Sequence, residues 1–198
     1  MLLSLIKKWS RPGARTEART HVSPRRLHIG GQIAHPEWKI LDVIAGPHVD
    51  FVGDCTDLSI FGDASIEEVY ASHVLEHLGY AHALPTALRE IHRVLVPGGT
   101  LCASVPDLDI LCALFLDQEA SAKQRMKLMH MMFGGQTNDV DFHRIGLNDE
   151  LLRGFLAEAG FVDITRVNGF GLFSDASALA FKGKLISLNV TARKRPGA

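Results

Sequence analysis

The chain has 198 residues, of which 46% are hydrophobic and 22% are charged; this length is typical of one domain, and the composition excludes a wholly disordered chain. The net charge of −1 conceals an uneven distribution, because residues 1–26 carry seven basic side chains and the single acid Glu17, leaving 14 basic and 21 acidic residues in 27–198. An acidic body of this kind is not typical of a nucleic-acid-binding protein, and only the basic leader is expected to attract an anionic partner such as a membrane surface.

The cysteines and the apolar runs of the sequence indicate in which cellular compartment the protein resides. Three cysteines at positions 55, 102 and 112 are too few and too widely spaced for a disulfide scaffold or a thiolate zinc site, and free thiols are typical of a reducing compartment. No apolar run approaches the roughly 18 residues that a membrane span needs. The opening run Met1–Ile6 is too short for the core of a signal peptide, and its charges follow it. We therefore expect a cytoplasmic protein.

A basic leader precedes a series of short apolar runs. Within the leader, Leu2, Leu5, Ile6 and Trp9 recur at helical spacing, which is enough for a short amphipathic turn. From residue 27 onward, apolar runs separated by turn residues have the length and side-chain types of strands. The predicted strands are Leu27–Ile29, Ile40–Val43, Phe51–Val52, Glu68–Ser72, Thr100–Val105, Phe161–Val167 and Ile186–Ala192.

Helical patterns lie between some of these strands. The first is marked by Leu84, Leu88, Ile91 and Leu95 and is expected to stop at Pro97-Gly98-Gly99, a strong terminator. Two more helices are predicted over Leu108–Leu116 and Lys123–Phe133. Four methionines near the second of these, Met126, Met129, Met131 and Met132, are expected to pack a core or to line a lid over an acceptor.

The last predicted helix has clear end signals. Asn148 can cap its beginning and Gly160 can end it, and its spacing predicts a buried side made of Leu151, Leu152, Phe155 and Leu156. Strands that alternate with helices indicate an α/β fold with a largely parallel sheet. Ligands of such sheets bind beyond the carboxyl ends of the strands, so the residues that follow each strand are the candidate site residues.

Three of these strand ends carry residues that suit an adenosine-containing ligand. Gly30 and Gly31 follow the first strand, where the absent side chains let a ligand approach the backbone. Asp42 lies at the end of the second strand, where a carboxylate can accept hydrogen bonds from both hydroxyls of a ribose. Asp54 follows the third and can accept from an exocyclic amine. Each residue alone is ordinary at its position, and their order and spacing together favour a site.

Two further motifs are more specific. A helix ends in Arg93-Val94-Leu95-Val96-Pro97-Gly98-Gly99 directly before a strand, and Leu75-Glu76-His77-Leu78 follows the preceding strand. With these motifs and the segments 27–31, 36–42, 52–54 and 70–78, the sequence resembles the class I S-adenosylmethionine-dependent methyltransferases, in particular their compact type-11-like group. The resemblance is good over residues 27–106. Gly160-Phe161 and the run 187–192 also fit the family's last helix–strand unit and closing strand.

This resemblance implies a fold, a cofactor and site residues. The fold would be α/β, with a Rossmann-like, seven-stranded, mostly parallel sheet whose last strand is antiparallel. S-adenosyl-L-methionine would lie against Gly30 and Gly31, with its ribose on Asp42, its adenine near Asp54 and Cys55, and its methionine end lined by Ser72 and His73. The methyltransferase domain would cover residues 27–192, between the basic leader 1–26 and a basic tail at 193–198.

The sequence departs from the family pattern in two ways. In the first motif, His28 replaces the usual acid and Gln32 stands where a glycine usually falls. In addition, only six residues separate Gly31 from Trp38, whereas a helical crossover between parallel strands needs a dozen or more. The first crossover helix is therefore expected to be shortened or absent. We hypothesise that the amphipathic segment Leu2–Trp9 packs near the sheet face left bare, and a disordered leader is the alternative.

The histidines near the fourth strand are the candidate catalytic residues. A histidine titrates near neutral pH and can take the proton of a hydroxyl acceptor, so His77 or His143 is the expected general base or acceptor-binding group. The run from His73 to His77 also has the spacing of the inverted zinc-peptidase motif, but it directly follows a strand, and we discount a peptidase. Some methyltransferases of small-RNA ends or quinone precursors resemble this segment and bind a divalent metal. A metal on His73, Glu76, His77 and His143 is thus an alternative, although we expect none.

The preferred function is a methyltransferase acting on a small-molecule acceptor, through a hydroxyl on a sugar, a lipid-linked or a quinone-like compound. The segment Phe170–Phe173 with Asp175 lies before the last strand, where family members often place acceptor contacts. A non-catalytic binding module with a degraded cofactor motif is the alternative. A nicotinamide-dependent dehydrogenase is less favoured, because Gly-x-Gly-x-x-Gly is missing and the glycine-to-acid spacing is about 12 residues where roughly 20 is expected.

Overall fold

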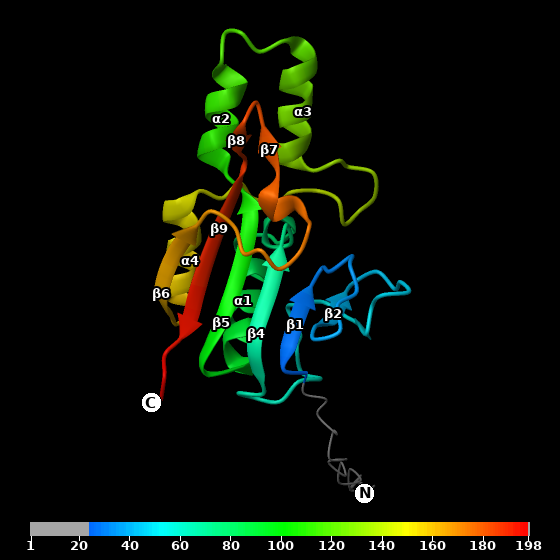
Figure 1. Ribbon diagram of the computed structural model, residues 1–198, viewed down its shortest axis with the longest axis vertical. Coiled ribbons are helices and arrows are strands. Elements are labelled where there is room, and N and C mark those ends of the chain that lie inside the picture. The colour runs from blue at the N-terminus through cyan, green and yellow to red at the C-terminus, as the bar shows by residue number, and fades with distance from the viewer. Residues whose placement is uncertain (1–23, 198) are drawn as a thin grey trace, which may run out of the picture.

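The computed structural model describes residues 24–197 and shows an α/β domain built on one seven-stranded sheet (Figure 1). The strands run in the spatial order β3-β2-β1-β4-β5-β9-β6. They are β1 (Arg26–Ile29), β2 (Lys39–Asp42), β3 (Phe51–Val52), β4 (Ile66–Ser72), β5 (Leu95–Pro106), β6 (Phe161–Val167) and β9 (Ser187–Lys194). A separate two-stranded sheet pairs β7 (Ala180–Phe181) with β8 (Lys184–Leu185). All seven predicted strands are present in the main sheet.

The pairing directions confirm the predicted fold class. Strands β1 to β5 run parallel to one another, and β9 runs antiparallel to both β5 and β6. The register sets His28 beside Tyr70 and Tyr70 beside Cys102, so these three side chains share one face of the sheet. The chain order changes direction across the sheet between β1 and β4, and a topological switch of this kind is where ligands bind in α/β proteins.

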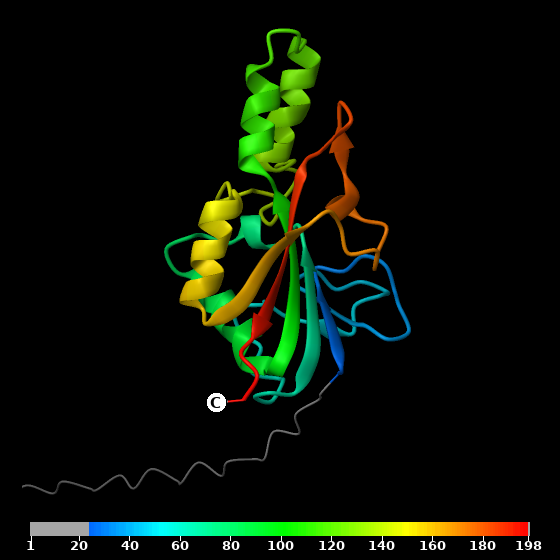
Figure 2. The same cartoon turned by 60° about the vertical axis from the view of Figure 1, so that its left-hand side comes forward.

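Four helices accompany the sheet, together with the short 3-10 helices η1 (Leu75–His77) and η2 (Ala176–Ala178). Helices α1 (Ala83–Val94) and α4 (Asp149–Glu158) lie on one side of the sheet, as Figure 2 shows. Helices α2 (Leu108–Leu116) and α3 (Ala122–Phe133) form a hairpin beyond the end of the sheet. None of the helices within residues 24–197 has the length and apolar character required to cross a membrane.

Several helix details differ from the sequence predictions. Helix α1 ends at Val94, ahead of the predicted terminator, because Leu95 already pairs with Ile66 and the Pro97-Gly98-Gly99 turn lies within an irregular part of β5. Asn148 caps α4 by accepting a hydrogen bond from the Leu151 N–H at 3.0 Å, as expected. The Leu151 side chain, however, is 47% exposed, so the buried side of α4 is narrower than predicted and centres on Leu152 and Leu156. The four methionines of α3 also differ in burial. Met131 and Met132 pack between α2 and α3, whereas Met126 and Met129 are exposed.

No helix joins β1 to β2, which confirms the expected loss of the first crossover helix. A right-handed crossover from β1 to β2 would place that helix on the face opposite α1, because the chain moves across the sheet in the opposite direction there. On that face the structure has instead residues 168–179, which we call the strap. Phe170 and Phe173 of the strap pack against Trp38 and Tyr70. The proposed covering segment Leu2–Trp9 lies outside the described residues.

Hydrogen bonds fix the strap to the sheet. The Tyr70 hydroxyl donates to the Asp175 carboxylate at 2.8 Å, and the Ser187 hydroxyl donates to the Ala176 carbonyl at 2.7 Å. The side-chain amide of Asn189, a residue with no exposed surface, donates to the Ser177 carbonyl at 2.9 Å. The strap therefore has a defined position over β4, β5 and β9 rather than lying loosely over them.

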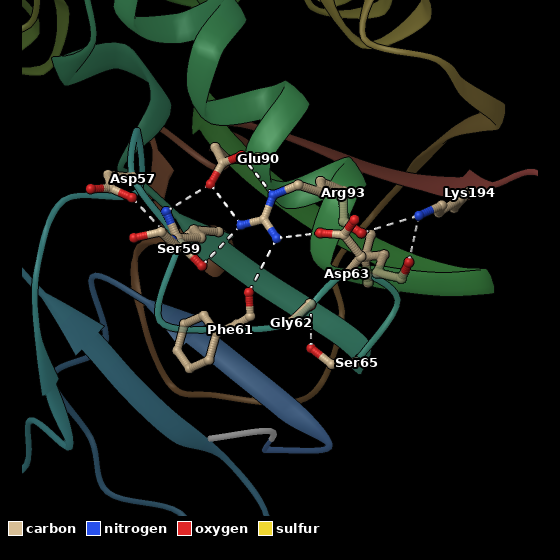
Figure 3. A network of polar contacts seen from close by, with 11 residues as sticks. Asp57, Ser59, Phe61, Gly62, Asp63, Ser65, Glu90, Arg93 and Lys194 are labelled. Atoms are coloured by element: carbon tan, nitrogen blue, oxygen red, sulfur yellow. Dashed lines mark hydrogen bonds and ion pairs between the residues drawn. The ribbon is translucent and has the colours of Figure 1, made fainter. Parts of the chain in front are cut away.

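The arginine of the helix-end motif ties α1 to the loop that follows β3. Arg93 makes two hydrogen bonds of 2.8 Å to the Glu90 carboxylate and donates to the carbonyls of Leu58 and Phe61 (Figure 3). It also forms an ion pair with Asp63 at 2.7 Å. Because this loop begins with Asp54 and Cys55, the network holds the segment that carries these two residues against α1.

Replacing Arg93 with lysine should destabilise the domain. A lysine cannot make the paired contacts to Glu90 and also reach the loop carbonyls, so we expect the free energy of unfolding to fall by about 2 kcal/mol. Urea denaturation followed by circular dichroism measures this change. Arg89→Lys is the control, because Arg89 is exposed and bonds only Thr86 on its own helix; equal stability of the two variants would contradict the structural role of Arg93.

Candidate functional site

A cavity of about 660 Å³ opens at the carboxyl ends of β1, β2, β3 and β4. Because parallel strands end at the same edge of the sheet, residues from four separate segments meet there. Six of the nine residues predicted to form the site line this cavity: Gly30, Asp42, Asp54, Cys55, His73 and His77. The other three, Gly31, Ser72 and His143, are not part of its lining.

Gly30 and Gly31, the two residues after β1, must be glycine for different structural reasons. Gly30 has a φ of +72°, and a Cβ there would lie 2.5 Å from Cγ2 of Val74, so only glycine fits where this turn meets the turn after β4. A Cβ on Gly31 would lie 2.7 Å from Nδ1 of His28. Gly31 is thus required by the histidine ring below it, whereas Gly30 faces the cavity.

His28, which occupies the position of the family's usual acid, points away from the cavity. Its ring is 3% exposed and lies 4.3 Å from the ring of Phe173 and 4.9 Å from that of Tyr70, measured between centroids. Its Nδ1 atom has no hydrogen-bond partner among the described residues. Burial lowers the pKa of His28 to about 4, so the ring is neutral at physiological pH.

Asp42 presents its carboxylate to the cavity from the end of β2. The Oδ1 atom accepts a hydrogen bond from the Ile44 N–H at 2.8 Å, and Oδ2 accepts from Nε2 of Gln32 at 3.1 Å. Each carboxylate oxygen has a second lone pair, so the group is held in place and can still accept from a ligand. Gln32, identified from the sequence only as a departure from the glycine pattern, is therefore a positioning residue for Asp42.

The turn after β3 supplies a carboxylate and a neutral thiol. Oδ1 of Asp54 accepts from the Thr56 N–H at 2.8 Å, which fixes the side chain at the cavity wall. Cys55 is 4% exposed. Burial, and secondarily the charge of Asp54, raises the pKa of the Cys55 thiol to about 12. The thiol is therefore protonated and is not suited to act as a nucleophile.

The turn after β4 is strained and polar. His73 has a φ of +54°, and its backbone N–H donates to the Ser104 carbonyl at 2.8 Å. Its Nε2 atom lies 3.0 Å from the hydroxyl of Ser187, which joins the turn to β9 and to the strap. The hydroxyl of Ser72 is buried without a partner among the described residues and lies outside the cavity lining.

A pair of histidines lies close to this turn. The rings of His77 and His143 meet edge to face with centroids 4.8 Å apart, although the two residues are far apart in the chain. Nδ1 of His77 lies 3.2 Å from the Phe142 carbonyl. Burial lowers the pKa of His143, and the nearby carboxylate of Glu76 opposes this shift. The structure thus brings together the two residues proposed from sequence as catalytic.

Glu76 lies beside this pair and is 1% exposed. Its carboxylate and one ring nitrogen from each of His77 and His143 lie within 4.8 Å of one another. His73, the fourth member of the metal alternative, lies outside this group, and its Nδ1 atom is 3.3 Å from Oε1 of Glu76.

Other cavity residues carry little signal in the sequence. Asp139 and Arg144 reach the cavity from the long segment between α3 and α4, and only their closeness in sequence to His143 could have indicated them. The apolar side chains of Val43, Ile44 and Leu78 also line the cavity. They follow strand ends or η1, where the sequence does not distinguish an apolar residue of the core from an apolar residue that lines a pocket.

Comparison with known proteins finds a family similar to part of the chain. A family model described as a methyltransferase domain matches residues 20–103, which include β1 to β4, α1 and the cavity residues that follow the strands. Over these residues the chain is similar to methyltransferase domains. A search of curated protein sequences finds no matching relative.

Solved structures share this fold at low sequence identity. An S-adenosylmethionine-dependent methyltransferase from Archaeoglobus fulgidus is 16% identical, with a TM-score of 0.54 over 88% of this chain and 87% of that one. A 1,6-didemethyltoxoflavin N1-methyltransferase from Burkholderia thailandensis is 18% identical, with a TM-score of 0.53 over 87% and 72%. The CurJ carbon methyltransferase is 15% identical, with a TM-score of 0.50 over 89% of this chain, which spans only 50% of that protein.

The buried His28 should make the stability of the domain depend on pH. The pKa of His28 is 6.5 when unperturbed and about 4 in the fold, so between these values the unfolded chain binds more protons. As pH falls from 6.5 to 4, this residue should lower the free energy of unfolding by up to about 3 kcal/mol.

His28→Phe removes the titrating group and keeps an aromatic ring beside Phe173. Chemical denaturation at several pH values should therefore show a flatter dependence for this variant than for the wild type. His130→Phe, at an exposed position of α3, should retain the wild-type dependence. Parallel pH curves for wild type and His28→Phe would show that His28 is not the neutral buried group described above.

Proposed function

We propose that the protein is an S-adenosylmethionine-dependent methyltransferase that acts on a small-molecule acceptor through a hydroxyl group. The observation that supports this most is the cavity at the switch point of a methyltransferase fold, which is lined by Asp42, Asp54 and His77. The ring of His77 in turn contacts that of His143 outside the lining. Hydrogen-bond acceptors for a nucleoside and groups able to handle a proton thus meet in one place.

The residues of the cavity fit this cofactor. A volume of about 660 Å³ lies within the usual range of roughly 300–1,000 Å³ for small-molecule sites. Asp42 keeps a free lone pair on each oxygen for the ribose hydroxyls, and Asp54 can accept from the adenine amine. Apolar surface for the base is offered by Val43, Ile44 and Leu78. When bound, S-adenosylmethionine supplies a methyl group on a positively charged sulfur. A nucleophile attacks the methyl carbon in line and the sulfur leaves.

The chain itself contributes orientation and proton handling. Carboxylates held by backbone N–H groups fix the cofactor end of the cavity, and such positioning accounts for much of the rate in a bimolecular transfer. The lowered pKa of His143 keeps its ring neutral near physiological pH, so that the histidine pair can bind a hydroxyl acceptor and assist the loss of its proton.

The acceptor class follows from the same pair of residues. A hydroxyl must lose a proton to become a competent nucleophile, and a histidine is the side chain best matched to that step near neutral pH. The net negative charge of residues 27–198 disfavours nucleic acid as the acceptor. A sugar, a lipid-linked intermediate or a quinone-like compound fits these requirements. Three free cysteines favour a reducing compartment such as the cytoplasm.

A specific observation keeps the non-catalytic alternative open. Gln32 donates a hydrogen bond to Asp42 and thus occupies part of the acceptor capacity expected for the ribose. A binding module would retain the cavity but would bind S-adenosylmethionine weakly and transfer nothing.

A single-turnover assay with S-adenosylmethionine labelled on its methyl group distinguishes the two. Incubation of the purified protein with small-molecule extracts should give one labelled product per chain. The double variant His77→Ala, His143→Ala should slow the transfer by about 100-fold or more and should change cofactor affinity little. His130→Ala is the matched control, because that ring is exposed on α3.

Two results would count against the proposal. Absence of any labelled product, together with weak cofactor binding, would favour the binding module. Full activity of the double variant with an unchanged pH profile would remove the histidines from the reaction.

A further inference from the structure

The feature that the proposed function leaves unexplained is the carboxylate of Glu76. The residue belongs to η1, directly after β4, and is 1% exposed. Neither Oε1 nor Oε2 has a hydrogen-bond donor among the described residues. A buried carboxylate without donors is costly unless a cation or a proton compensates its charge. Some group must therefore meet this side chain in the working protein.

Neutral His73 does not satisfy Glu76. The hydroxyl of Ser187 donates its hydrogen to the Ala176 carbonyl at 2.7 Å, so at the 3.0 Å contact with His73 the ring nitrogen Nε2 must be the donor. In the neutral ring, Nδ1 then carries a lone pair, and it faces Oε1 of Glu76 at 3.3 Å. Two acceptors face each other there, and the contact offers the carboxylate no hydrogen.

The other two neighbours of Glu76 can serve as ligands. Nδ1 of His77 lies against the Phe142 carbonyl, which can only accept, so the proton resides on Nδ1 and the lone pair on Nε2. Metal-binding histidines are commonly oriented by donating their second ring nitrogen to a carbonyl, as His77 does. The ring of His143 meets that of His77 edge to face, and one of its nitrogen atoms lies within 4.8 Å of the ligand atoms of both Glu76 and His77.

We propose that Glu76, His77 and His143 form a binding site for one divalent transition-metal ion of the zinc type. Their ligand atoms lie within 4.8 Å of one another, which is close enough for a shared ion. Two imidazoles and a carboxylate suit Zn²⁺ and its first-row neighbours better than Mg²⁺ or Ca²⁺, which prefer oxygen ligands. The ion supplies the positive charge that the buried carboxylate lacks. This assignment revises the expectation from sequence, in which a metal was the less favoured alternative.

The position of the site suggests its role, and this step rests on the proposed function. His77 lines the cavity, so an ion bound to it would lie next to the acceptor. Three protein ligands leave a coordination position for another oxygen. A hydroxyl bound there has a lowered pKa, so the two histidines would act by holding the ion rather than by taking the proton themselves.

Metal binding is measured without cofactor or acceptor, which separates this test from the test of methyl transfer. The full-length protein is depleted of metal with a chelator and titrated with Zn²⁺ by calorimetry, and Co²⁺ is used as a spectroscopic probe through its visible absorption. The wild type should bind one Zn²⁺ per chain. Glu76→Gln and His143→Ala should each weaken the affinity by at least about tenfold and alter the Co²⁺ spectrum.

His130→Ala and Cys112→Ser control for adventitious binding to exposed side chains and should retain wild-type affinity. If Glu76→Gln fails to fold by circular dichroism, His143→Ala alone decides, because its half-buried ring is less critical for the core. The proposal is overturned if the wild type binds no stoichiometric Zn²⁺. It is equally overturned if both variants bind as tightly as the controls.

Discussion

The short connection between β1 and β2 is the constraint on which the rest of this domain depends. Residues 30–38 span the distance but leave no room for a helix, so the face opposite α1 loses the cover that a crossover helix would give it. The strap from residues 168–179 takes that place, and its Phe173 packs on His28. A charged acid at position 28 would be buried under an aromatic ring, whereas a neutral histidine is tolerated there. The departure from the family's first motif and the missing helix are therefore one structural adaptation.

The carboxylates in the cavity and the one beside it have different surroundings. On the side of β2 and β3, the carboxylates of Asp42 and Asp54 are held by backbone N–H groups and remain open to solvent, where they can accept hydrogen bonds. On the side of η1, Glu76 is buried next to imidazoles, where its charge requires compensation. The first environment suits a neutral nucleoside with many donors, and the second suits a cation. The Arg93 network fixes the loop that follows Asp54 against α1.

Local patterns in the sequence were sufficient for most of the architecture. Seven strands, the cap at Asn148 and the absent first helix follow from residue type, spacing and chain length, which act over a few residues. Contacts between distant segments were not accessible in this way. The packing of Phe173 on His28, the approach of His143 to His77 and the exposure of Leu151 depend on how elements meet in space. Gly31 illustrates the difference: the sequence predicts that a ligand approaches its backbone, whereas the structure shows the ring of His28 where a Cβ would lie. The assigned roles of the cavity residues remain predictions.

The central claim is that the cavity at the strand ends binds the nucleoside of S-adenosylmethionine through Asp42. Titration calorimetry with S-adenosylhomocysteine, the demethylated form of the cofactor, tests it without any knowledge of the acceptor. The account predicts binding of one molecule per chain, weakened by at least about tenfold in Asp42→Asn, since hydrogen bonds to a charged group contribute roughly 1.5–3 kcal/mol. Asp163→Asn, at an exposed position on β6, should bind as the wild type does. Absence of binding to the wild type, or equal affinity in Asp42→Asn, would contradict the account.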